Sequence, residues 1–480
     1  MGTIVEQAPA SATARYAGWW RWIVVLAPGV LLSVIAPVGL TISQSRLLGI
    51  FLSTILALIA RPVPTGVTVI VAIAVLGVTR TLSPENILSG FSNPTVWLTV
   101  TAFLFAHAVT ATGVGNRVGY LFIRLFAHTP LRLGYAVAAA DLSLAPFIPS
   151  DTARGGGIIF PITVSLSQVF GSKPGPTARR MGTFLMLTAF HATYTASAMF
   201  LTGMAANPLI AEFAYQTAHV RLTWVRWFNA SAVPGLLALL VVPYVISLMF
   251  KPEIQNTEPA RHLAACELER MGPLKRSERW LVLIIVAVMI GWITSPWHGV
   301  SNTFVALGGL AAMLLSKVIS WEELLAEHRA WDTLIWFGPL IMMSDALNRA
   351  GLVALFSNKL FAQMHGWRWA LVLVALVSAY LYIHYTFASM TAHATALYSA
   401  FLGAALVGGV PPLVAALALA FFSNLNAGIT HYGTGSAPVY FGAGYVSQAD
   451  WWRTGFLISV LNLMIWLGVG IWWWKLIGLW

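Results

Sequence analysis

Apolar runs close to 20 residues long recur along almost the whole chain, and they restrict its possible folds more than any other feature. A helix needs about 20 mainly apolar residues to cross the hydrocarbon core of a bilayer. The pattern therefore predicts an all-α polytopic membrane protein with about 11 transmembrane helices and two re-entrant hairpins. The runs lie near 22–38, 46–60, 65–79, 95–113, 133–149, 182–205, 232–250, 279–295, 302–316, 332–348, 369–388, 411–428 and 454–478.

The composition agrees with a lipid-embedded chain. Only 9% of the 480 residues are charged, against about 25% in a soluble domain. This excludes a soluble globular domain, a disordered chain and a secreted disulfide scaffold. The net charge of +11 is explained by basic residues retained in cytoplasmic loops, so no nucleic-acid partner is expected. The single cysteine, Cys266, lies in an expected polar loop and indicates neither redox nor metal chemistry.

The chain divides at its most polar stretch, which carries six Lys and Arg residues. These residues, with those near 173–180 and Arg15 and Arg21, should face the cytoplasm, so we expect an inner-membrane, multi-pass protein with a cytoplasmic N-terminus. The first residues match neither a cleavable signal nor a myristoylation pattern. The expected parts are a tail (1–21), a first membrane half (22–250) with a hairpin near 133–170, a cytoplasmic connector (251–279), and a second membrane half (280–480) with a hairpin near 369–409.

The two halves repeat each other. Placing Ser150 over Ser389 aligns Ser-x-Thr-Ala in both halves, and about 37 residues upstream Gly113 falls opposite Gly351. Downstream, GMAANPLI, which begins at Gly203, corresponds to GTGSAPVY, which begins at Gly433. Three matches in register predict an internal duplication. Such repeats are characteristic of secondary transporters, which hold substrate at the bilayer midplane between broken helices.

The first polar patch, PSDTARGGG at 149–157, predicts a helix that begins inside the membrane. Proline ends the incoming helix, and Ser, Asp and Thr are N-cap residues, so free N–H groups would point into a cavity and favour an anion. Ser150 and Thr152 could donate hydrogen bonds to a carboxylate, and Arg154 could add a permanent charge. The alternative is a structural helix cap in which Arg154 pairs with Asp151.

The second patch lies at residues 384–393 and again places two hydroxyls, on Ser389 and Thr391, at an expected helix break. His384 and His393 flank it, and either could supply a positive charge if protonated. Taken singly, each histidine could instead be a hydrogen-bonded interior residue. Their spacing does not match a metal site, and none is expected.

The third patch, at residues 423–438, is rich in Gly, Pro and hydroxyl side chains and predicts an unwound loop that lines a cavity. Its counterpart in the first half is the segment around Gly203 to Asn207. The candidate residues in the second half are Gly433, Thr434, Gly435 and Ser436. For four further polar residues in or near spans we expect ion pairing or interfacial placement, namely Asp141, His191, Asp345 and Arg349.

At these residues the chain resembles the divalent anion/sodium symporter family, and within it the citrate, tartrate and 2-oxoglutarate/malate exchangers. The resemblance covers about residue 20 to the C-terminus. It is most specific in PSDTARGGGIIFPI, FASMTAHATALYSAFL and SNLNAGITHYGTGSAPVYFGAGYV. It implies an inverted repeat of 11 spans and two re-entrant hairpins, an elevator-type movement and a homodimer.

The resemblance also implies where substrate binds. In the family a Ser-Asn-Thr motif at each hairpin tip binds substrate carboxylate and, in some members, helps to hold sodium. The matching positions here are Ser150, Asp151, Thr152 and Ser389, Met390, Thr391. Met390 replaces an asparagine, and a thioether is a poor ligand for a hard cation, so a sodium ion is disfavoured there. Asp151 places a carboxylate where substrate carboxylate is expected, which leaves proton or sodium coupling open.

These features predict a transporter of di- or tricarboxylates such as malate, succinate, 2-oxoglutarate, tartrate or citrate. A sodium-independent antiporter is favoured, and a sodium- or proton-coupled symporter is the alternative. Ser150, Thr152, Ser389 and Thr391 would bind the carboxylates, and Arg154 with His384 or His393 would supply positive charge. No cofactor is expected. A membrane enzyme is less favoured, because no nucleophile–base set or metal cluster is visible in the sequence. An anion channel is the other rival, and it would differ by conducting without a counter-substrate.

Overall fold

The computed structural model describes residues 19–480, and within that range it is helical with no β-strand. The expected tail 1–21, with Arg15 and the N-terminal signals, falls almost entirely outside the described residues. The helices of the first half are α1 (Trp19–Val34), α2 (Ile42–Ala60), α3 (Thr65–Val78), α4 (Pro84–Leu88), α5 (Pro94–Thr112), α6 (Val114–Phe126), α7 (Pro130–Leu144), α8 (Phe160–Val169), α9 (Gly182–Met199), α10 (Ala206–Ala218) and α11 (Trp224–Met249).

The connector and the second half are also made of helices. Their helices are α12 (Glu258–Met271), α13 (Arg276–Ile293), α14 (Ser295–His298), α15 (Asn302–Leu315), α16 (Trp321–Ala326), α17 (His328–Arg349), α18 (Leu352–Phe361), α19 (Trp369–Ile383), α20 (Met390–Val407), α21 (Pro412–Leu425), α22 (Ala437–Gly442), α23 (Gln448–Leu463) and α24 (Gly470–Leu476). Short 3₁₀ turns are η1 (Ser89–Ser92), η3 (Ala178–Arg180), η4 (Ala362–Met364), η5 (His384–Thr386) and η6 (Asn426–Ile429), and two π-helical segments are η2 (Thr152–Ile159) and η7 (Met464–Val469).

Capping residues in the sequence set where the helices of the first repeat begin. The Asn93 side chain accepts a hydrogen bond from the backbone N–H of Thr95, and Pro94 is the first residue of α5. Thr129 does the same for Arg132, and Pro130 opens α7. An N-cap oxygen satisfies an otherwise unpaired N–H group, and proline has no N–H to leave unpaired at the first position. Local chemistry therefore determines these boundaries.

The predicted duplication is visible as a repeated order of elements. In the first half a long helix (α5) turns at Gly113 into a shorter helix (α6), and in the second half α17 turns at Gly351 into α18. Both glycines have left-handed backbone angles, with φ of 82° and 74°, which glycine adopts without a steric penalty. The α17–α18 bend measures 72°. The pairing of Gly113 with Gly351 is thus confirmed as a shared turn.

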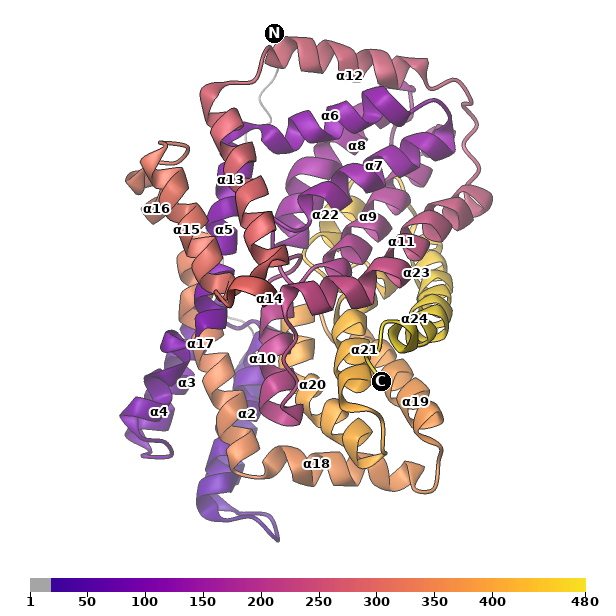
Figure 1. The fold of residues 1–480 in the computed structure, drawn as a ribbon. Helices are drawn as coiled ribbons and strands as arrows, with labels where there is room; N and C mark the ends of the chain where they lie inside the picture. Colours follow the sequence, from indigo (N-terminus) through magenta and orange to yellow (C-terminus); the bar gives the residue numbers. More distant parts are fainter. Residues whose placement is uncertain (1–18) are drawn as a thin grey trace.

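The second copy of this unit points the opposite way. Figure 1 shows α6 with α12 at one end of the molecule and α18 at the other end. The helices α3, α4, α5, α15, α16 and α17 lie along one side, whereas α9, α11, α21, α23 and α24 lie on the other (Figure 1). The hairpins and unwound loops belong to this second side, where α9 is buried along its whole length.

Helical hairpins lie in both stretches where the sequence predicts re-entrant hairpins, and their re-entrant course through a membrane stays a prediction. The first consists of α7, a turn at 145–151, η2 and α8, and the second of α19, η5 and α20. Each is followed by a buried helix and then by an unwound segment, at 200–205 after α9 and at 430–436 after η6. These segments match the two loops expected from the Gly-rich sequence.

Among the described residues, seven helices are long and apolar enough to cross a membrane, or eight if the bent pair α17 and α18 is one span. Three shorter apolar helices are Arg21–Val34, Thr65–Val78 and Asn302–Leu315. The chain is therefore a multi-pass membrane protein. The number of 11 spans, the homodimer and the cytoplasmic N-terminus stay predictions.

The connector is more ordered than its polar composition suggests. Residues Glu258–Met271 form α12, which packs on α6, so Cys266 lies on a helix and not in the expected loop, although its side chain is exposed. Arg117 of α6 binds Glu278, which is buried, at 3.1 and 3.2 Å, and donates to the carbonyl of Gly272 at 2.9 Å. This ion pair fixes the connector to the first repeat.

Candidate functional site

The tip of the first hairpin is a helix start, as its sequence predicts. Ser150 Oγ accepts a hydrogen bond of 3.1 Å from the backbone N–H of Ala153. The helix that follows is π-helical from Thr152 to Ile159, a geometry that is rare and often found at functional sites. Thr152 is exposed and Ser150 is half-buried, so both residues lie at least partly open at the tip.

The tip of the second hairpin has the same local construction. Ser389 Oγ accepts a hydrogen bond of 3.3 Å from the backbone N–H of Ala392 and caps α20. Thr391 is half-buried, whereas Met390 is 5% exposed. The two serines that the alignment pairs therefore occupy equivalent capping positions in the two repeats.

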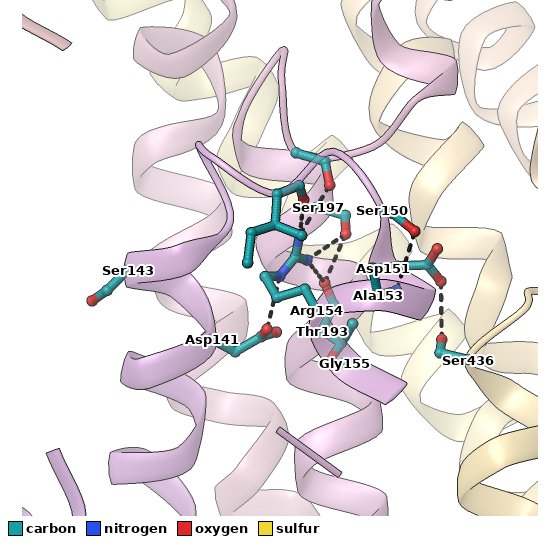
Figure 2. Close-up of polar contacts among 12 residues, drawn as sticks. Asp141, Ser143, Ser150, Asp151, Ala153, Arg154, Gly155, Thr193, Ser197 and Ser436 are labelled. Carbon is teal, nitrogen blue, oxygen red and sulfur yellow. Dashed lines mark hydrogen bonds and ion pairs between the residues drawn. The ribbon is translucent and has the colours of Figure 1, made fainter. Parts of the chain in front are cut away.

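Asp151 joins the first hairpin to the unwound loop of the second repeat. Its Oδ2 accepts hydrogen bonds from Thr434 Oγ1 and, at 2.9 Å, from Ser436 Oγ. Figure 2 shows the Asp151 carboxylate pointing toward Ser436 and away from Arg154. The sequence separation is 285 residues for Asp151 and Ser436, so only the fold brings these groups together.

Close packing explains why a glycine lies between the two hydroxyl donors. A Cβ atom on Gly435 would be 2.4 Å from Thr152 Oγ1, closer than van der Waals contact allows. The absent side chain lets the loop approach the hairpin tip, and it leaves the Thr152 hydroxyl beside the Gly435 backbone.

The same loop is tied at its other end to the second hairpin. His384 Nε2 donates a hydrogen bond of 2.9 Å to the carbonyl oxygen of Gly433. The segment 433–436 is therefore held between Asp151 of one hairpin and His384 of the other. This arrangement places the third polar patch between the other two.

Buried polar groups without protein partners cluster around the two histidines. The His393 Nδ1 atom lies 3.0 Å from Asn426 Nδ2, and the two histidine rings are 5.0 Å apart. In the described part of the chain, the atoms His384 Nδ1, His393 Nε2, Asn426 Oδ1 and Thr430 Oγ1 are buried and have no hydrogen-bond partner in the protein. Because buried polar groups are normally paired, these atoms indicate a place for water or a polar ligand.

Arg154 does not lie where the sequence led us to expect it. Its side chain is completely buried, and all five N–H donors of the guanidinium have internal acceptors. It pairs with Asp141, not with Asp151. The acceptors are Asp141 Oδ1 (2.8 Å), the carbonyl oxygens of Ile148 (2.9 Å), Gly203 (3.0 Å) and Thr193 (2.9 Å), and Ser197 Oγ (2.7 Å). The Arg154 side chain turns into the protein (Figure 2). Its N–H groups therefore form hydrogen bonds within the protein in place of the expected contact with a substrate.

Gly203 and Asn207, the candidates from the first unwound loop, also have structural contacts. Asn207 Nδ2 donates to the carbonyls of Ser197 and Phe200, each at 2.9 Å, and its Oδ1 accepts from Asn424 Nδ2 at 2.8 Å. Gly203 offers its carbonyl to Arg154. Both residues hold the backbone of the loop at 200–205 in place, and Asn207 links that loop to the second repeat.

Of the four further polar residues in or near spans, Asp141, Asp345 and Arg349 form the expected ion pairs, whereas His191 is buried and forms neither an ion pair nor an interfacial contact. Asp141 forms the ion pair with Arg154, and Asp345 pairs with Arg349 one helical turn away at 2.6 Å. His191 Nδ1 hydrogen-bonds to the hydroxyl of Tyr194 in the same buried helix. Among residues 19–480 no three His, Cys, Asp or Glu side chains lie close enough to hold a metal ion together.

Three residues that contact the first hairpin were not predicted from the sequence. Thr193 and Ser197 lie four residues apart on α9 and accept hydrogen bonds from Arg154, and Tyr440 donates to the carbonyl of Gly155 at 2.9 Å. Ser197 is one of several hydroxyl residues on α9 and does not stand out among them, and a backbone carbonyl such as that of Thr193 has no signal in the sequence. Tyr440 gave no signal, because an aromatic residue is unremarkable in an apolar chain.

Known proteins support this architecture. The family described as "Sodium:sulfate symporter transmembrane region" matches residues 16–480. "Putative malate transporter YflS" of Bacillus subtilis (strain 168) is 46% identical over 460 residues, covering 95% of this chain and 96% of that protein. "Dicarboxylate transporter 1, chloroplastic" of Arabidopsis thaliana is 44% identical over 459 residues, covering 95% of this chain and 82% of that protein.

A solved structure shares the fold. It is named "Crystal structure of the Alcanivorax borkumensis YdaH transporter reveals an unusual topology", and it matches with a TM-score of 0.57 over 83% of this chain and 89% of that one, at 16% identity. The relatives and the family indicate a transporter and not an enzyme. With two inverted repeats, two hairpins and a family match over almost its whole length, this chain belongs to the sodium:sulfate symporter family, the divalent anion/sodium symporters that its sequence motifs resemble.

Proposed function

We propose that this protein exchanges C4 and C5 dicarboxylates, such as malate, succinate and 2-oxoglutarate, across the inner membrane without sodium. The names of the relatives support the substrate class, since they are given as malate and dicarboxylate transporters. The paired hairpin tips support a carboxylate site, because each offers a serine hydroxyl at a helix start and helix N-termini favour anions. Tartrate and citrate are further candidates of the same chemistry.

The observation that carries sodium independence is the position of Arg154. Its guanidinium is surrounded by three backbone carbonyls, a hydroxyl and a carboxylate. Hard cations prefer such oxygen atoms as ligands, and here a permanent organic cation already occupies them. In the second repeat, Met390 offers a thioether where an oxygen ligand would be needed.

In this proposal the hydroxyls of Ser150, Thr152, Ser389 and Thr391 bind the carboxylates of the substrate. Thr434 and Ser436 lie in the segment between the hairpin tips and add two further donors. His384 and His393 each have one buried ring nitrogen without a protein partner. A proton on either ring would provide positive charge for a dianion.

Counterflow in proteoliposomes tests this function. Purified protein is reconstituted with unlabelled succinate inside, and uptake of labelled succinate is followed in sodium-free buffer. We expect uptake only into vesicles that contain a dicarboxylate, with no increase on adding sodium. Uptake into empty vesicles driven by a sodium gradient would contradict exchange and favour symport.

A proton-coupled or sodium-coupled dicarboxylate symporter is the second candidate. One observation favours it, namely the carboxylate of Asp151, which is 6% exposed and lies at the tip where substrate is expected. A carboxylate can hold a proton or a cation. Uptake into empty vesicles driven by a pH gradient alone would select this alternative.

A further inference from the structure

We infer that Asp151 takes up one proton from solution when a dicarboxylate binds, so that the proton and the dianion occupy the site together. The inference rests on the proposed function, since it assumes a dicarboxylate at the hairpin tips. It assigns a defined role to the aspartate that replaces the asparagine of the family motif.

The contacts of Asp151 come from hydroxyl groups. Its Oδ2 accepts from Thr434 Oγ1 and Ser436 Oγ, and Thr152 Oγ1 lies 3.5 Å from its Oδ1. The ion pairs found among residues 19–480 do not include Asp151. A buried carboxylate is thus held by neutral donors at the place where a second anion has to bind.

The charged and titratable neighbours do not neutralise it. Arg154, three residues away, donates to Asp141 of α7 and points away from Asp151 (Figure 2). Asp141 and Tyr440 of α22 are near enough to interact electrostatically with Asp151, and neither carries a positive charge. His384 of η5 donates to Gly433, the residue before Thr434, and so reaches the loop and not the carboxylate.

An ionised Asp151 therefore opposes substrate binding in two ways. It repels the dianion in an environment that screens charge poorly, and it occupies the hydroxyls of Thr434 and Ser436, which a substrate carboxylate would need as donors. Protonation removes the repulsion, and it turns Asp151 into a weaker acceptor for Thr434 and Ser436. The neutral carboxyl group also has an O–H that can donate to the substrate.

Proton uptake by Asp151 changes only one bond. The carboxylate of Asp151 and one proton from water give the neutral acid, and no other bond forms or breaks. The new O–H donates to a substrate carboxylate, and Thr434 and Ser436 turn their hydroxyls to the same anion. The loaded site then holds a dianion and one proton.

Calorimetric titration of succinate into the purified full-length protein tests this inference. At one pH near neutrality and in sodium-free medium, the binding enthalpy is measured in several buffers that differ in ionisation enthalpy. The slope against that enthalpy counts the protons taken up. We expect about one proton per succinate for the wild type, and an affinity that falls up to about tenfold per pH unit as pH rises.

Two variants show whether Asp151 is the group that takes up the proton. Asp151→Asn keeps the shape and the family motif but cannot take up the proton, so it should bind succinate with no proton uptake and little pH dependence. Asp345→Asn is the matched control, because Asp345 pairs with Arg349 on α17 and not with the hairpin tips. It should behave as the wild type does.

The wild type alone can overturn the inference, even if Asp151→Asn fails to fold. Succinate binding without proton uptake contradicts it and leaves the proposed function standing, as does binding that requires sodium in place of the proton. Proton uptake that persists in Asp151→Asn also contradicts it. If the wild type binds none of the C4 and C5 acids, the proposed function is wrong and the inference falls with it.

Discussion

Arg154 Nε donates a hydrogen bond of 2.8 Å to Asp141 Oδ1, and neither side chain is exposed at all. Asp141 lies on the first arm of the hairpin and Arg154 just after its tip, so the pair joins the two arms. Two charges buried together compensate each other only while both are present. The pair therefore holds the first hairpin in the geometry that positions Ser150 and Asp151.

We predict that Arg154→Ala destabilises the whole protein. Removing the guanidinium leaves Asp141 as an uncompensated buried charge, which costs about 3–5 kcal/mol. The thermal midpoint of the purified protein should fall markedly, and transport should disappear with the folded state. Arg349→Ala is the control, since its exposed pair with Asp345 contributes only about 0.3–0.5 kcal/mol. An Arg154→Ala protein with an unchanged midpoint and no transport would instead indicate direct contact with substrate.

The hydroxyl of Ser436 should contribute to substrate affinity. Ser436→Ala removes a buried donor that lies 2.9 Å from Asp151, and a hydrogen bond to a charged group is worth about 1.5–3 kcal/mol. We expect the half-saturating succinate concentration in counterflow to rise at least tenfold. Ser143→Ala is the matched control, because Ser143 is exposed and bonds to its own helix at Ala139, pointing away from the site (Figure 2). Equal effects of the two substitutions would contradict the assignment.

His384 should act through the position of the loop. His384→Ala removes the donor to the Gly433 carbonyl, whereas His384→Gln keeps an N–H group that can reach it. A neutral hydrogen bond is worth about 0.5–1.5 kcal/mol, so we expect a loss of affinity between about twofold and tenfold in the alanine variant and a smaller one in the glutamine variant. Labelled succinate counterflow measures both. His365→Ala, at an exposed histidine, should change nothing, and an alanine variant with wild-type affinity would exclude this role.

Gly435→Ala should block the close contact between the loop and the first hairpin. The added Cβ would lie 2.4 Å from Thr152 Oγ1, and overpacking of this kind costs about 1–3 kcal/mol. Transport and the thermal midpoint of the purified protein should both fall. The second substitution, Thr152→Gly, should relieve the clash and restore the thermal midpoint but not the affinity for succinate. Gly442→Ala, where a Cβ meets nothing within 4 Å, is the control. If Gly435→Ala retains full activity, the loop is not held against Thr152 during transport.

The single cysteine can report the orientation of the chain. Cys266 is exposed on α12 of the basic connector, which the positive-inside rule places in the cytoplasm. A membrane-impermeant maleimide should therefore label the protein in inside-out vesicles and not in intact cells, and Cys266→Ser should abolish the signal. Labelling in intact cells would reverse the predicted topology.

The sequence was sufficient for features that depend on neighbours along the chain. Helix starts at Asn93 and Ser389 follow from a capping side chain and the next turn of backbone. The turns at Gly113 and Gly351 follow from a residue that accepts a left-handed conformation. Apolar runs, hairpins and unwound loops were likewise predictable, because lipid requires apolar side chains and paired backbone groups.

Partners across the fold were decided by the tertiary structure alone. The sequence identified Asp141, Asp151 and Arg154 as unusual buried charges, but not that Arg154 would choose Asp141 and leave Asp151 to hydroxyls 283 and 285 residues away. Local spacing allows either carboxylate, since both lie within reach of a long side chain. The choice depends on where α9 and the loop at 200–205 place their carbonyl oxygens, and on how the second repeat meets the first. The sequence thus determined which polar groups enter the membrane, and the packing of the two repeats determined which of them remain for the substrate.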